Sequence, residues 1–155
     1  MKSSPAEIRR ALLQLEQTAP RLADATSGRT DDALHAAPGS ETWSAAGILA
    51  HLRACADLWT HSVYAMLAKA SPELPDIDER KWARVTKYAD LPFAVSLQAF
   101  TLQRNVLLSV LGALPPEGWE RDAIILGRRH TVFTQARRMA KHEAEHCEQV
   151  KALLR

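Results

Sequence analysis

The sequence predicts an all-α protein, a four-helix bundle with long connecting loops, and two observations carry that prediction. Four long segments repeat apolar residues at the three- and four-residue steps of an amphipathic helix. Among 155 residues there are only 6 Gly and 8 Pro, and most of the Pro fall between these segments or at their starts. Long amphipathic helices bury their apolar stripes against one another, as in a bundle. We expect residues 1–155 to form a single domain with its own core.

The first predicted helix begins at residues 4–7, Ser-Pro-Ala-Glu, which form a capping box with Pro at the first helical position. An apolar stripe at helical spacing follows, made by Ile8, Leu12, Leu15, Ala19 and Leu22. Residues 25–41 are polar and contain Gly28, Pro38 and Gly39, so they predict a long loop.

The second predicted helix spans residues 44–70. One side of it carries Ile48, Leu52, Cys55, Trp59, Ser62 and Met66. His51 lies at the edge of that stripe, and His61 lies on the opposite side. Residues 71–90 carry two Pro and many charges, which indicates a connection with at most one short helix near residues 78–84.

The third predicted helix starts near Pro92, ends before Pro115, and is apolar on two sides, which is typical of a central helix or of a dimer contact. Residues 118–127 predict a loop with a few extended residues. The last helix is expected at residues 131–154. Its stripe, at helical steps, is Val132, Ala136, Met139, His142, His146, Val150 and Leu153.

Two histidines therefore lie on the buried face of the last helix. His142 and His146 are four residues apart, which places their Cβ atoms about 5–6 Å from each other on one face. Two imidazoles at that distance can reach one metal ion. The alternative is a pair of ordinary core or surface histidines.

The letters HEAEH at residues 142–146 also match the zinc-peptidase pattern His-Glu-x-x-His. That class needs a third ligand downstream, but Glu148 is the only carboxylate after His146, and it lies on the same helix. No predicted sheet offers an edge along which a peptide substrate would lie. The neighbourhood of the motif argues against a peptidase.

A third ligand should therefore come from upstream, and His51 is the best candidate because it lies mid-helix beside the core face. Cys55, one turn later, is either a competing soft ligand or a small buried residue. The remaining histidines are placed less well, in a loop, facing away or too far along the axis: His35, His61 and His130.

Three segments together resemble the DinB/YfiT-like superfamily. Residues 43–52 resemble its W-S-x(n)-I-L-x-H-L segment, and residues 141–150 resemble its H-E-x-x-H-x-x-Q-I helix. Residues 119–132 are similar to its W-x-R…G…T-V approach to the last helix. The resemblance extends from about residue 4 to residue 154, and the order and spacing of the three segments make it fairly specific.

This resemblance implies a four-helix bundle that holds a divalent metal, zinc or nickel, through three histidines. By position these are His51, His142 and His146. It also implies frequent homodimers, and relatives that include transferases and isomerases using low-molecular-weight thiols.

Arg104 and Glu143 are the candidate catalytic residues. Arg104 lies on the core stripe of the third helix, where a guanidinium needs an acidic partner. That partner is either a carboxylate, such as Asp57 or Glu143, or an acidic substrate that Arg104 clamps. Glu143 and Glu145 either orient an imidazole N–H or are solvated helix charges, and Gln149 has the same two alternatives.

Two functions remain open at this point. One is a metal-dependent transferase or hydrolase for a small molecule, with a thiol as co-substrate, and the other is a non-catalytic, metal-stabilised binding or stress-response module. A formal net charge of +2 without a basic patch indicates no nucleic-acid partner. No apolar run is long enough to span a membrane, and the N-terminus has no signal-peptide core. We expect a cytoplasmic protein with both cysteines as free thiols.

Overall fold

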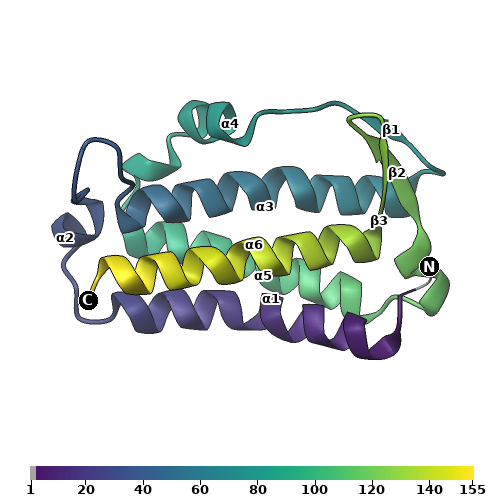
Figure 1. Cartoon of the computed structure of the whole chain (residues 1–155), viewed down its shortest axis with the longest axis horizontal. Helices are drawn as coiled ribbons and strands as arrows, with labels where there is room; N and C mark the ends of the chain where they lie inside the picture. Colours follow the sequence, from purple (N-terminus) through teal and green to yellow (C-terminus); the bar gives the residue numbers. More distant parts are fainter. Residues whose placement is uncertain (1–2) are drawn as a thin grey trace.

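Four long helices form the body of the protein in the computed structural model, which describes residues 3–155. They are α1 (Pro5–Thr26), α3 (Ala45–Ala68), α5 (Phe93–Gly112) and α6 (Val132–Leu153), and they lie side by side in Figure 1. Each of α1 and α3 packs against both α5 and α6. Helices α1 and α3 therefore occupy opposite corners of the bundle. The predicted all-α four-helix bundle is confirmed.

The helix ends follow the signals in the sequence. Ser4 Oγ accepts a hydrogen bond from the Glu7 N–H, and the Glu7 carboxylate accepts one from the Ser4 N–H at 3.0 Å, so the capping box is present. Thr131 and Thr134 form the same reciprocal pair at the start of α6. The start of the helix that carries His142 and His146 is thus fixed by local sequence.

The two long connections contain short helices. Residues 25–41, predicted as a loop, include α2 (Asp31–His35), which Thr30 caps and whose Leu34 is buried. The second connection contains α4 (Glu79–Thr86), close to the predicted position, and a 3₁₀ turn at Tyr88–Asp90. Helix α4 lies along the outside of α3 (Figure 1). A second 3₁₀ turn covers Pro116–Glu120.

A small sheet, which the sequence analysis did not predict, lies at the end of the bundle where α6 begins (Figure 1). Strand β1 (Glu73–Leu74) pairs in parallel with β2 (Asp122–Ile125), and β2 pairs antiparallel with β3 (Arg128–Thr131). Leu126 and Gly127 both have positive φ, of 52° and 69°, as a two-residue hairpin turn requires. The expectation of no sheet was wrong because strands this short leave too few residues for a period-two pattern.

Within the described residues, no helix is both long and apolar enough to cross a membrane.

Candidate metal centre

Helices α3 and α6 bring three histidines to one point. The Nε2 atom of His142 lies 3.0 Å from Nε2 of His51 and 3.1 Å from Nε2 of His146. The ligand atoms of all three lie within 4.8 Å of one another. His51 is buried, and the other two are half-buried. The other histidines, His35, His61 and His130, lie outside this cluster.

This arrangement fits a divalent metal ion. A tetrahedral zinc with Zn–N bonds of 2.0–2.1 Å sets its imidazole nitrogens about 3.3 Å apart, close to the separations here. One proton on His142 Nε2 cannot serve both neighbouring nitrogens, whereas one cation between three lone pairs can. The donor set suits a metal ion better than a network of hydrogen bonds among neutral rings.

Gln149 determines which nitrogen of His146 is available. The His146 Nδ1–H donates to the Gln149 side-chain oxygen at 2.8 Å, so Nε2 of the same ring keeps its lone pair. Of the two alternatives for Gln149, the structure therefore favours orientation of an imidazole. Nδ1 of His142 is buried and finds no hydrogen-bond partner in the described part of the chain.

Burial keeps His51 and His142 uncharged at neutral pH. Desolvation, together with smaller contributions from the neighbouring His146 and His51, lowers the pKa of His142 to about 3. Desolvation also lowers the pKa of His51, with a smaller contribution from His146. Neutral imidazoles are the form that binds a metal, so His51 and His142 are already in the form that an incoming ion requires.

Two tryptophans form walls around the histidines. The ring of Trp43 lies 5.0 Å from that of His51, and the ring of Trp59 lies 4.9 Å from that of His142. Trp59 is buried, and the guanidinium of Arg138 lies 4.4 Å above its ring. These ring contacts restrict the orientations of the His51 and His142 imidazoles.

Cys55 is close to the histidines but lies outside the cluster. Its Sγ atom is 3.6 Å from His51 Nε2, yet the set of mutually close ligand atoms does not include it. Burial raises the pKa of the Cys55 thiol to about 12, which favours the protonated form. The structure thus favours a buried thiol over a fourth ligand, and no fourth side chain of the described residues joins the histidine cluster.

The candidate catalytic residues Glu143 and Arg104 bind each other. Both are 2% exposed, Arg104 Nη2 donates to Glu143 Oε1, and Thr18 Oγ1 donates to Glu143 Oε2 at 2.8 Å. Glu143 thus contacts α1 and α5, whereas His142 beside it turns towards α3. The interpretation of Glu143 as a solvated charge was wrong, and Arg104 adopts its salt-bridge alternative. Glu145 is exposed, 3.9 Å from Lys141.

A pocket of about 490 Å³ opens beside His51, between α3 and the segment that contains α4. Its inner wall is made by Trp43, Gly47, Ala50 and His51. Its outer wall is made by Arg80, Ala83, Arg84, Lys87, Ala89 and Asp90. The sequence did not predict this outer wall, because residues 71–90 were interpreted as a connection between helices. The many charged residues of that segment were the only sequence feature that pointed to it.

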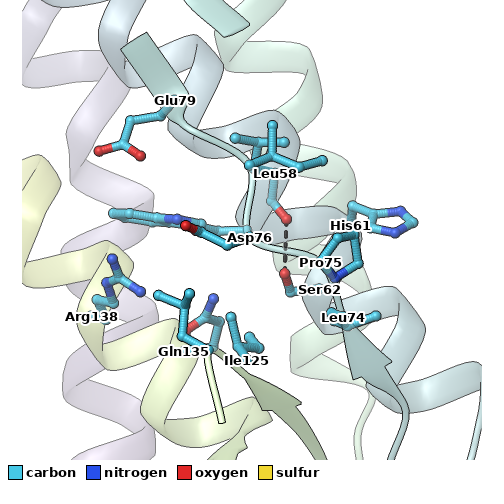
Figure 2. A pocket seen from close by; sticks show the side chains of 13 residues that line it. Leu58, His61, Ser62, Leu74, Pro75, Asp76, Glu79, Ile125, Gln135 and Arg138 are labelled. Carbon is cyan, nitrogen blue, oxygen red and sulfur yellow. Dashed lines mark hydrogen bonds between the residues drawn. The ribbon is translucent and has the colours of Figure 1, made fainter. Parts of the chain in front are cut away.

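A smaller pocket of about 110 Å³ lies next to Trp59. Figure 2 shows Gln135 and Arg138 of α6 on one side of it and Glu79 of α4 on the other. The negative charge of Glu79 opposes the lowering of the His51 pKa that burial causes. Its carboxylate is therefore within electrostatic reach of His51, and the sequence analysis did not identify it.

Comparison with known proteins agrees with this architecture. Residues 14–150 match the DinB superfamily. YfiT from Bacillus subtilis, described as a probable metal-dependent hydrolase with an unusual four-helix bundle topology, has a similar structure with a TM-score of 0.83. The sequences are 16% identical, and the match covers 98% of this chain and 88% of YfiT. No curated protein is significantly similar in sequence.

Proposed function

We propose, because this chain belongs to the DinB superfamily, that it is a divalent-metal-dependent enzyme acting on a small molecule as a thiol transferase or hydrolase. The main observation that supports this proposal is that three imidazole nitrogens converge beside an open pocket. The description of YfiT as a probable metal-dependent hydrolase also supports the proposal of a metal-dependent enzyme.

In this proposal His51, His142 and His146 hold the ion, and Gln149 keeps His146 in the correct tautomer. Neutral imidazole ligands suit zinc and nickel. A divalent ion held there would supply the Lewis acidity that turns a water molecule or a thiol into a nucleophile at neutral pH.

Other side chains would handle the substrate. Glu79 is half-buried and within electrostatic reach of His51, and it would accept the proton of the attacking water or thiol. Trp43 and Ala50 would form the apolar wall of the pocket.

Cys55 and Cys147 are both buried free thiols, which suits a reducing cytoplasm.

The pocket also favours an enzyme over a non-catalytic module. A purely structural metal site is closed by a fourth protein ligand. Within the described residues, no fourth side chain joins the three histidines, and a space of about 490 Å³ adjoins His51.

A reconstitution experiment tests the proposal. Metal-free protein, protein loaded with zinc or nickel, and His146→Ala protein are assayed for thiol transfer from cysteine or glutathione to monobromobimane and for hydrolysis of p-nitrophenyl acetate. We expect turnover in the loaded wild type and none in the metal-free or His146→Ala protein, whereas loaded Glu79→Gln should retain the metal and show a lower kcat. Equal rates in the loaded and the chelated protein would contradict the proposal.

A further inference from the structure

We propose that Arg80, Arg84 and Lys87 bind an anionic group of the substrate, so that the substrate is a small carboxylate or phosphate ester. The inference rests on the proposed function, because it takes the histidine cluster as the reacting centre. It replaces the idea that Arg104 clamps an acidic substrate, since Arg104 is buried against Glu143.

The two arginines face the same way. Arg80 and Arg84 are four residues apart on α4, so their side chains are neighbours on one face of that helix. Lys87 follows in a left-handed conformation, with φ of 53°, at the end of α4. All three line the pocket that His51 also lines, so an anion bound by them would lie beside the histidines.

The pocket is strongly cationic compared with the rest of the chain. Three cations and one carboxylate, that of Asp90, line it, so its net charge is 3 − 1 = +2. The whole chain has the same formal net charge of +2. The side-chain ion pairs of the described residues involve other basic groups, namely Arg21, His35, Arg104, Arg129 and Lys141. An anionic ligand would therefore find these cations without a competing ion pair.

Packing does not explain the basic face of α4, because no residue of this helix is buried. The helix is nevertheless anchored to α3 through Asp57. The carboxylate of Asp57 accepts hydrogen bonds from Trp82 Nε1 at 2.9 Å and from the Tyr88 hydroxyl at 2.7 Å. These anchors flank Arg84 in sequence and hold its backbone in place, as a binding site requires.

The chemistry of the pocket indicates the kind of ligand. A guanidinium binds the two oxygens of a carboxylate or phosphate with parallel hydrogen bonds. Trp43, Gly47 and Ala50 provide an apolar wall opposite the cations. The volume is within the range of about 300–1,000 Å³ that is typical of small-molecule sites. An aromatic or short aliphatic acid therefore matches both walls.

Calorimetric titration of the metal-free protein tests this inference. The probes are benzoate, phenyl phosphate and the neutral benzamide, and the variants are Arg80→Gln and Arg84→Gln. Lys81→Gln is the matched control, because Lys81 is exposed on the same helix and does not line the pocket. Thermal melts confirm that each variant is folded.

We expect one or both anions to bind the wild type and the control, and benzamide to bind at least tenfold more weakly. Each arginine variant should weaken the binding of the anion by about tenfold or more, as for a charged hydrogen bond. Comparing benzoate with phenyl phosphate identifies the preferred anion.

Three results would overturn the inference: no binding of either anion, equal binding of benzamide, or anion binding that is unchanged in both arginine variants. The titrations use metal-free protein, so they are independent of the metal centre. Elemental analysis of the same preparations after exposure to zinc tests the metal centre separately, and the two failures are thus distinguishable.

Discussion

Replacing Arg104 with Met should destabilise the fold and leave the metal centre intact. The side chains of Arg104 and Glu143 are 2% and 3% exposed, so the substitution leaves a carboxylate with Thr18 as its remaining partner. Removal of one partner from a buried ion pair typically costs about 3–5 kcal/mol. For a chain of this size each kcal/mol lowers Tm by about 2–4 °C, so we expect a decrease of roughly 6–20 °C.

Replacing Glu143 with Gln in the same protein should reverse much of this destabilisation. Burial raises the pKa of Glu143, and Arg104 opposes that rise, so the lone carboxyl in Arg104→Met would take up a proton. Gln at position 143 has no charge and still accepts the hydrogen bond from Thr18. The double variant Arg104→Met/Glu143→Gln should therefore recover a large part of the lost stability.

The assay combines urea unfolding with zinc titration of each folded variant. We expect the free energy of unfolding to fall in Arg104→Met and the zinc Kd to change by less than about tenfold. Loss of a hydrogen bond that orients a metal ligand weakens metal binding by at least about that factor, so a smaller change indicates that the ligands are undisturbed. If Arg104→Met kept wild-type stability and zinc affinity but lost turnover, the pair would be catalytic, and its assignment to the core would be refuted.

The remaining predictions concern pH, metal affinity and assembly. The pKa of His142 is about 3 in the fold and about 6.5 in the unfolded chain, so metal-free protein should lose stability as pH falls from about 6.5 towards 3, where the unfolded chain binds the extra proton. Thermal melts of His142→Phe should depend less on pH, and parallel curves would contradict this. Gln149→Leu should weaken zinc binding by about 10–100-fold with an unchanged Tm, because Gln149 is exposed and orients His146; an unchanged Kd in zinc titration would count against that role. We also predict a homodimer through the exposed apolar face of α5, where Leu102 is 68% exposed. Leu102→Lys should then sediment as a monomer, and a monomeric wild type would show the prediction to be wrong.

The sequence predicts the parts of the site that belong to long helices. Steps of three and four residues place His142 and His146 on one face of α6, and the residues around His51 resemble a known segment. A periodic pattern identifies which face of a helix is buried. It does not identify the partner across the core, so the pairing of Glu143 with Arg104 was one of several alternatives.

The rest of the pocket left no periodic signal. Helix α4 has only eight residues and none of them is buried, so Arg80 and Arg84 look like ordinary surface charges in the sequence. Their significance depends on the hydrogen bonds to Asp57, which bring α4 against α3 over a long sequence separation. Such a contact depends on the tertiary fold, and propensity does not encode it.

X-ray absorption at the zinc edge of the reconstituted protein tests the central claim most directly. We expect one zinc ion per chain, bound by three imidazole nitrogens at about 2.0–2.1 Å and one light-atom ligand from solvent, with no sulfur at about 2.3 Å. The same spectrum should be lost in His51→Ala. A protein that takes up no zinc, or a zinc shell that contains the Cys55 sulfur, would contradict an open three-histidine centre.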